Sequence, residues 1–249
     1  MENISFKGNN GYRLAARLDK PKGSIRAYAL YAHCFTCSKD IVAASRIARA
    51  LKDNGIAVVR FDFTGIGASE GDFSNTNFSS NIEDLVTAAD FMRTTYQAPA
   101  LIIGHSLGGA AVLAAAHKIA EIKAVVTLCS PAHVAHVAEN FKNHVSDIME
   151  NGQAEVCLVG RSFTIKRQFL EDVQGFQLKD LVENLDKALL IMHSPTDVTV
   201  SINNASQLFG WAKHPKSFVS LDNADHLITR KADAEYAGKV IVAWADRYI

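Results

Sequence analysis

The stretch ALIIGHSLGGAAVLAA, residues 100–115, decides the fold because it combines a strand pattern, a sharp turn and a helix pattern. Its first half is a continuous apolar run, which is typical of a strand buried on both faces. Gly104, Ser106 and Gly108 complete the motif G-x-S-x-G, whose glycines let the strand and the helix pass closely. We therefore predict that Ser106 lies at the start of a helix extending to Ile119, where free N–H groups favour negative charge.

Apolar strand patterns and amphipathic helix patterns alternate on both sides of this stretch. The alternation predicts one α/β domain over residues 1–249, built on a mostly parallel, doubly wound sheet. Asp40 and Gly55 are expected to cap and stop the helix that they enclose. The expected strands are residues 4–8, 12–19, 27–33, 57–63, 100–106, 124–130, 188–194 and 216–222, and the expected helices are 40–55, 81–95, 107–119 and 232–248.

One segment, residues 131–187, interrupts the alternation. It contains no buried-strand pattern and is too long for a plain connection between two elements. Residues 155–169 within it predict a hairpin with Gly160 and Arg161 near the turn, flanked by helical patterns. We expect this segment to form a small cap that covers the site and sets its preference for substrate.

A serine hydroxyl becomes a strong nucleophile only when a base removes its proton, so Ser106 needs partners. The order expected for a G-x-S-x-G turn is serine, then acid, then histidine. Asp197 and His226 follow the last two expected strands, at the sheet edge where sites of α/β proteins gather. Asp222 and Asp225 are weaker candidates for the acid, because Asp222 lies at a strand end and Asp225 adjoins His226.

Composition narrows the remaining possibilities. The chain has 249 residues, with 26 Lys plus Arg against 26 Asp plus Glu, so its net charge is zero. A neutral chain lacks the basic face of nucleic-acid-binding proteins. No secretory signal and no apolar run long enough to span a bilayer are found, which predicts a cytoplasmic protein without a membrane partner. The 4 cysteines are too few for a disulfide scaffold, which predicts free thiols.

The stretch HCFTCSKD, residues 33–40, allows three interpretations: a C-x-x-C redox pair, part of a metal site, or a loop in which the cysteines are incidental. A reactive C-x-x-C normally lies at a helix N-terminus, whereas the next helix is expected to begin only at Asp40. Zinc would need a fourth ligand besides His33, Cys34 and Cys37, and no second pair has matching spacing. We therefore predict no metal and no organic cofactor.

Taken together, these motifs resemble the α/β-hydrolase family over nearly the whole chain. They are most similar to the serine-aminopeptidase-like and feruloyl-esterase-like branch, and within it to the hydrolase domain often fused to an OsmC-like domain. That resemblance implies an OsmC-like domain, in cis or in trans, as a partner. The motifs are His33–Thr36, FDFTGIGASEGDF (61–73), NTNFSSNIEDL (75–85), GHSLGG (104–109), RQFLEDV (167–173), SPTD (194–197) and NADH (223–226).

The resemblance also implies roles for residues around the nucleophile. The backbone N–H groups of Phe35 and Leu107 are expected to form the oxyanion hole, and His33 is expected to brace the loop. Cys34 stands where the broader family has glycine, so its side chain should narrow the pocket. His33, Cys34 and His105 are the residues that we expect near the substrate.

These observations predict a serine hydrolase that cleaves carboxylic esters of small or aromatic acyl groups through a Ser106–His226–Asp197 triad and an acyl-enzyme. Thioesterase, acyltransferase and peptidase activities use the same triad and stay open. A different alternative is a thiol-redox partner of a peroxidase module that uses Cys34 and Cys37. A third alternative is an interaction domain without catalytic activity.

Overall fold

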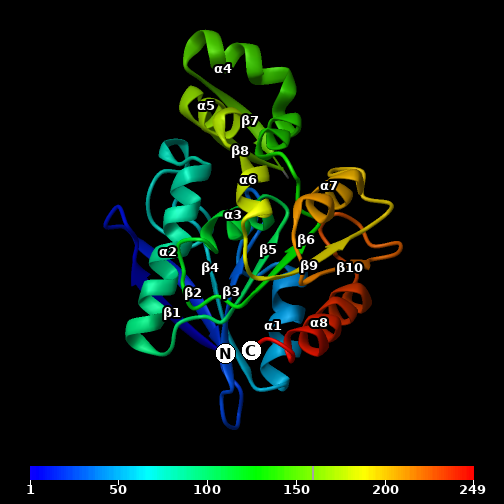
Figure 1. Cartoon of the computed structure of the whole chain (residues 1–249). Coiled ribbons are helices and arrows are strands. Elements are labelled where there is room, and N and C mark those ends of the chain that lie inside the picture. The colour runs from blue at the N-terminus through cyan, green and yellow to red at the C-terminus, as the bar shows by residue number, and fades with distance from the viewer. Residues whose placement is uncertain (159) are drawn as a thin grey trace.

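The computed structural model describes residues 1–158 and 160–249 (Figure 1). Within these residues the main sheet has eight strands in the order β1-β2-β4-β3-β5-β6-β9-β10. The strands are β1 (Glu2–Lys7), β2 (Arg13–Asp19), β3 (Ala27–Ala32), β4 (Ile56–Phe61), β5 (Leu101–His105), β6 (Ala124–Leu128), β9 (Ala188–His193) and β10 (Lys216–Ser220).

The sheet is antiparallel at one edge and parallel elsewhere. β1 pairs with β2 and β2 with β4 in antiparallel fashion, and every later neighbour is parallel. The chain order reverses at β3, which lies between β4 and β5. The predicted doubly wound, mostly parallel sheet is thus confirmed, and the reversal opens a crevice at the carboxyl ends of the central strands.

Helices cover both faces of the sheet (Figure 1). All of β3 is buried, and its side chains alternate between two cores, with Leu30 on one face and Tyr31 on the other. One core packs under α2 (Phe78–Thr95) and α3 (Leu107–Ala115), and the other under α1 (Val42–Asp53) and α8 (Lys231–Ala245). No helix in the described residues combines the length and apolar character that crossing a membrane requires.

Several helix assignments differ from the sequence prediction, and among them α3 ends at Ala115 rather than at Ile119. α1 begins at Val42 with Ile41 as its N-cap, so Asp40 does not cap it; Asp40 instead pairs with Arg17 at 3.0 Å. α2 begins earlier than expected because Asn77, its N-cap, forms a capping box with Ser80. α7 (Asn203–Trp211) was not predicted, since its apolar pattern is short and weak.

Most of the segment between β6 and β9 forms a separate layer of short helices and one hairpin, at the top of Figure 1, whereas α6 (Leu178–Glu183) lies lower and packs against α3 and α7. Leu158 pairs with Arg161 across the hairpin turn, so the expected hairpin is confirmed on either side of Val159, which lies outside the described residues. Buried side chains such as Phe141 and Ile148 give the segment an apolar interior. The other elements are η2 (Val134–His144), α4 (Val145–Asn151), β7 (Gln153–Leu158), β8 (Arg161–Lys166) and α5 (Arg167–Gly175).

Candidate active site

Ser106 occupies a strained turn between β5 and α3. Its backbone has φ +54° and ψ −124°, a conformation that side chains other than glycine rarely adopt. The close approach depends on small neighbours: a Cβ on Gly104 would collide with the carbonyl of Gly108, and one on Gly108 with the carbonyl of His33. The strain raises the Ser106 hydroxyl out of the strand at the first turn of a helix.

The structure brings Ser106, His226 and Asp197 into one hydrogen-bonded chain. The Nε2 atom of His226 lies 3.0 Å from the Oγ atom of Ser106, and its Nδ1 atom lies 2.7 Å from Oδ2 of Asp197. A carboxylate only accepts, so Nδ1 carries the proton and leaves Nε2 free to accept one from Ser106. His226 and Asp197 reach this position from the loops after β10 and β9.

Asp197 is buried and fully engaged. Its Oδ1 accepts the backbone N–H groups of Thr199 at 2.8 Å and Val200 at 2.9 Å, while Oδ2 faces His226. Burial alone would raise the pKa of Asp197, but the hydrogen bonds from His226 and from these backbone groups outweigh it and lower the pKa below its usual value. Asp197 therefore stays ionised beside the imidazole.

The two weaker candidates for the acid point elsewhere. Asp222 accepts the hydroxyl of Ser220 at 2.5 Å, and Asp225 accepts the backbone N–H of Thr229 at 2.8 Å. Both carboxylates complete local turns and neither forms a hydrogen bond with His226. The geometry therefore assigns the acid position to Asp197.

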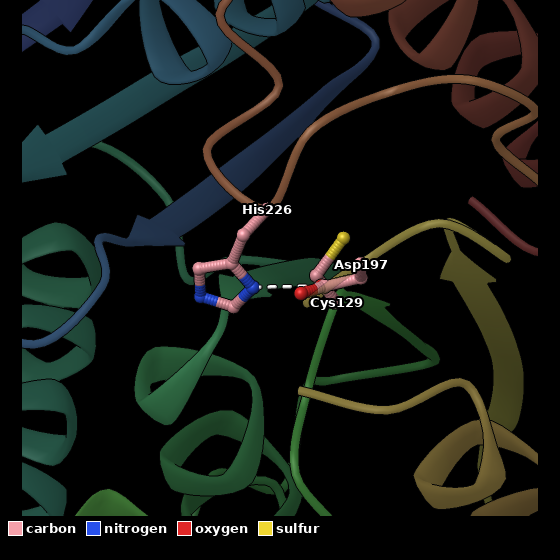
Figure 2. Close-up of side chains that lie close together, drawn as sticks. All are labelled: Cys129, Asp197 and His226. Carbon is pink, nitrogen blue, oxygen red and sulfur yellow. Dashed lines mark hydrogen bonds and ion pairs between the residues drawn. The ribbon is translucent and has the colours of Figure 1, made fainter. Parts of the chain in front are cut away.

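Cys129 lies beside the acid, as Figure 2 shows, which the sequence gave no reason to expect. Its sulfur, a carboxylate oxygen of Asp197 and a ring nitrogen of His226 lie within 4.8 Å of one another, a grouping with the donor types of a metal site. Burial and the charge of Asp197 raise the pKa of Cys129. Metal binding needs a thiolate and an available carboxylate, so this donor set suits a metal poorly.

Phe35 and Leu107, whose backbone amides are the expected oxyanion donors, line the same cavity as Ser106. Leu107 is the first residue of α3, whose N–H has no partner within the helix. In the described part of the chain, no backbone carbonyl or side chain accepts a hydrogen bond from the N–H of Phe35. The arrangement leaves both donors available for an oxygen atom bound next to Ser106.

His33 and His105 are buried and bond to the backbone of residues that line the site. His33 donates from Nδ1 to the carbonyl of Cys34 at 2.8 Å and accepts the N–H of Phe63 at Nε2, and burial lowers its pKa so that it stays neutral. His105 donates to the carbonyl of His226 at 2.7 Å, and burial lowers its pKa to about 3. His105 does not line the cavity beside Ser106, so its side chain positions the His226 backbone rather than a substrate.

Cys34 and Cys37 form a disulfide, so the prediction that all cysteines are free thiols is wrong. The free cysteines of the described residues are Cys129, which is buried, and Cys157, which is exposed. The two bonded residues are three positions apart, and the turn between them brings their Cα atoms to 5.3 Å. In this state neither sulfur is a thiolate ligand for a metal.

Two further contacts hold the same loop and were missed from the sequence. Asp62 accepts the backbone N–H of Lys39 at 2.7 Å and its ammonium at 2.6 Å, and both side chains are buried. Arg161, at the start of β8, donates from its guanidinium to the carbonyl of Thr36. The FDFTGIG motif could have pointed to Asp62, but no local pattern indicates a contact between residues 36 and 161.

A cavity of about 190 Å³ opens beside Ser106. The central domain supplies the nucleophile, the histidine and the disulfide loop, and the inserted segment supplies the facing wall. The lining is mainly apolar, which suits an uncharged acyl group. It consists of Cys34, Phe35, Thr36, Cys37, Ser106, Leu107, Pro131, His136, Val137, Asn140, Leu158, Thr199, Val200, His226 and Leu227.

Comparison with known proteins agrees with this geometry. The family model of the serine aminopeptidases, S33, matches residues 37–159. The crystal structure of an esterase domain from Rhodothermus marinus is 50% identical, covers 99% of this chain and 98% of that chain, and superposes with a TM-score of 0.81. The ferulic-acid complex of Est1E from Butyrivibrio proteoclasticus, 20% identical with 98% of each chain covered, shares the fold at a TM-score of 0.81.

A curated relative extends the comparison. Human monoglyceride lipase is 28% identical over an alignment of 202 residues that covers 72% of this chain and 66% of the lipase. The chain therefore spans slightly less than two thirds of that relative.

Proposed function

The chain belongs to the α/β-hydrolase family and is a serine hydrolase, and from that premise we propose that it cleaves carboxylic esters of small or aromatic acids. The observation that carries the proposal is the position of His226, which lies within hydrogen-bond distance of both Ser106 and Asp197. This arrangement makes the hydroxyl of Ser106 nucleophilic without a metal ion.

The reaction follows from the three side chains. His226 takes the proton of Ser106 at Nε2 as the Oγ atom attacks the ester carbonyl. Asp197, held ionised by its hydrogen bonds, stabilises the imidazolium that forms. His226 then returns the proton to the departing alcohol, and a water molecule releases the acyl group from Ser106 by the same route.

The negative charge on the carbonyl oxygen goes to the N–H groups of Phe35 and Leu107. Each such donor lowers the barrier by roughly 3 kcal/mol when it is fixed in advance. The Leu107 donor also lies at the first turn of α3, where the helix dipole favours negative charge.

The cavity supports the preference for a small or aromatic acyl group. About 190 Å³ accommodates a short chain or a single ring. Phe35, Val137 and Leu158 provide apolar walls, and none of the described residues that line the space is Lys, Arg, Asp or Glu. The 50% identical esterase domain supports oxygen esters, while the curated relatives include both a monoglyceride lipase and palmitoyl-protein thioesterases.

The first test is hydrolysis of p-nitrophenyl esters from C2 to C12 by wild type and by Ser106→Ala. We expect wild type to prefer the short esters and the variant to lose at least about 10⁴-fold in kcat. Ser206→Ala, which changes an exposed serine on α7, serves as the matched control and should retain full activity.

The same assay separates the alternatives that share the triad. An acyl thioester and a peptide nitroanilide are included, and oxygen esters should give the highest kcat/KM. A fluorophosphonate should label Ser106 in wild type only. If the wild type hydrolyses nothing and Ser106 takes up no label, the esterase proposal fails and a non-catalytic interaction domain becomes the better account.

A further inference from the structure

The turn from Cys34 to Cys37 has a backbone that its sequence does not favour. The N–H of Cys37 bonds to the carbonyl of Cys34 at 3.1 Å, and Thr36, third in the turn, has φ +59°. A positive φ at this place is typical of a type II turn, which strongly prefers glycine there. A threonine keeps this conformation only when its surroundings hold it.

Side chains from three directions hold the turn. The Cys34–Cys37 disulfide joins its two ends covalently. His33 donates to the carbonyl of Cys34, and Arg161 donates to the carbonyl of Thr36. Phe35 lies between the two cysteines, so these contacts restrain the short turn that carries its N–H, beside the cavity that Phe35 lines.

The disulfide is placed for control of this turn rather than for general stability. A loop closed by residues three positions apart gives less chain-entropy stabilisation than a longer loop. Both cysteines line the cavity beside Ser106, and Cys37 is half-buried rather than enclosed. Cys37 is therefore the more exposed of the two residues to a small thiol that enters the cavity, whereas Cys34 is 3% exposed.

We propose that the Cys34–Cys37 disulfide is a redox-active modification site that switches the hydrolase by holding or releasing the oxyanion amide of Phe35. The proposal rests on the proposed ester hydrolysis, because it concerns the oxyanion hole of that reaction. The closed bond is the active state. Its reaction partner is a dithiol reductant, and a disulfide of the same class restores the bond.

The exchange is chemically balanced. One thiolate of the dithiol attacks the Sγ atom of Cys37, the Cys34–Cys37 bond breaks, and Cys34 leaves as a thiolate that takes up a proton. The second thiol of the reductant then attacks the mixed disulfide and releases Cys37. The protein gains two electrons and two protons, and the dithiol is oxidised to a disulfide.

Opening the Cys34–Cys37 bond changes the direction of the Phe35 N–H and leaves Ser106 in place. Thr36 is then free to return to a negative φ, which rotates the neighbouring peptide groups and turns the Phe35 N–H away. Leu107, Ser106, Asp197 and His226 lie outside the turn and keep their contacts. Loss of one preorganised donor costs about 100-fold in kcat, and KM changes little because the donor acts on the transition state.

The test uses the full chain in its oxidised and reduced forms. The protein is reduced with dithiothreitol, freed of it by gel filtration without oxygen, and assayed with p-nitrophenyl butyrate. Mass spectrometry after maleimide treatment counts the thiols gained. We expect a kcat 10- to 100-fold lower in the reduced form with KM within about twofold, and recovery after oxidation by trans-4,5-dihydroxy-1,2-dithiane.

Matched variants assign the effect to this cysteine pair. The double variant Cys34→Ser, Cys37→Ser should have the kcat of the reduced protein and no response to dithiothreitol. Cys157→Ser, which removes the exposed free thiol, should respond as wild type does. If the double variant does not fold, as judged by circular dichroism, the reduced and reoxidised wild type decide the question.

Two outcomes separate the two proposals. If oxidised and reduced wild type hydrolyse the ester with equal kcat while the maleimide count shows an open bond, the redox proposal alone is overturned. If the oxidised wild type hydrolyses no ester and takes up no fluorophosphonate, the proposed function falls, and the redox proposal falls with it.

Discussion

The two amides proposed as oxyanion donors, those of Leu107 and Phe35, are held in place by different kinds of contact. Leu107 is fixed by backbone packing, because Gly104 and Gly108 let β5, α3 and the carbonyl of His33 approach without intervening side chains. Phe35 is fixed by side chains that come from distant parts of the chain: a disulfide, the Arg161 guanidinium and the buried Lys39–Asp62 pair. Backbone packing gives a donor that is rigid in all conditions, whereas separate side-chain contacts give one that solvent conditions and substitutions can release.

The largest effect is expected from Gly108→Ala, which disturbs the backbone packing that holds the amide of Leu107. The new Cβ would collide with the carbonyl of His33 and lie 2.8 Å from that of Ala32, so α3 must move away from β3. Displacing Ser106 and Leu107 together should lower kcat/KM on the order of 1,000-fold, as measured with p-nitrophenyl butyrate.

The matched control for this change is Gly210→Ala on α7. No atom lies within 4 Å of a Cβ at Gly210, so the added methyl should leave activity unchanged and stabilise the helix slightly. Near-normal activity of Gly108→Ala would mean that the elbow tolerates movement and that the contrast between the two amides is wrong.

Among the side-chain contacts that hold the loop of Phe35, the buried Lys39–Asp62 pair should contribute most to stability, and Asp62→Asn tests it. This change keeps the shape of the side chain but takes the 2.6 Å counter-charge from the buried ammonium of Lys39 and leaves it only the more distant, exposed carboxylate of Asp40 at 3.7 Å. Breaking one partner of a buried pair costs about 3 kcal/mol of the free energy of unfolding, measurable by urea denaturation.

Asp53→Asn is the surface comparison, since Asp53 is exposed and pairs with the exposed Arg49 at 3.7 Å. It should change the unfolding free energy by less than about 1 kcal/mol. Equal effects of the two substitutions would show that the buried pair does not hold the loop more firmly than a surface pair.

The same contrast explains what the sequence could predict. The order of the strands, the two-sided burial of β3, and the positions of Ser106, Asp197 and His226 follow from apolar periodicity and from motifs of a few residues. Those features are local, or they follow from parallel strands ending at one edge of a sheet. The structure brings the three residues together as expected, and their catalytic roles stay a prediction until the serine variant is assayed.

The missed features depend on contacts between distant residues. The meeting of Arg161 with Thr36 and of Cys129 with Asp197 has no signature in either segment. The prediction of free thiols at Cys34 and Cys37 rests on the expected helix start at Asp40 and on the small number of cysteines. Neither feature indicates whether a C-x-x-C pair is bonded. The OsmC-like partner implied by the resemblance stays a prediction as well.

Asp84 allows the side-chain-held region to be tested by pH. It lies on α2 and accepts the N–H of Thr64 at 2.9 Å and its hydroxyl at 3.1 Å, next to the loop that carries Phe35. Burial raises its pKa from 3.8 to about 6, although both bonds oppose the shift. The folded state therefore binds more protons than the unfolded state between pH 4 and 6, so stability falls as pH rises through that window.

Asp84→Asn should remove this dependence. Relative to wild type, the variant should gain about 2 kcal/mol in the free energy of unfolding between pH 4 and pH 7, measured by urea denaturation at each pH. Asp90→Asn, which changes an exposed carboxylate on the same helix, should leave the pH profile unaltered. Parallel curves for Asp84→Asn and wild type would show that Asp84 is not the group responsible.

The smallest effect is expected from Arg161→Ala, which separates the inserted segment from the turn. Losing one hydrogen bond to the carbonyl of Thr36 should lower kcat about fivefold, or about 1 kcal/mol, while the disulfide still holds both ends of the turn. Arg167→Ala removes an equal charge from the same segment. In the described residues the Arg167 guanidinium donates to the carbonyl of Glu150, which belongs to the inserted segment itself, so this change should leave kcat unchanged. In the reduced protein Thr36 is already released and the Phe35 N–H has turned away, so Arg161→Ala should cost less there than in the oxidised protein. A cost that is equal in both thiol states would mean that the two contacts act on different parts of the loop, and that the insertion and the disulfide do not share control of Phe35.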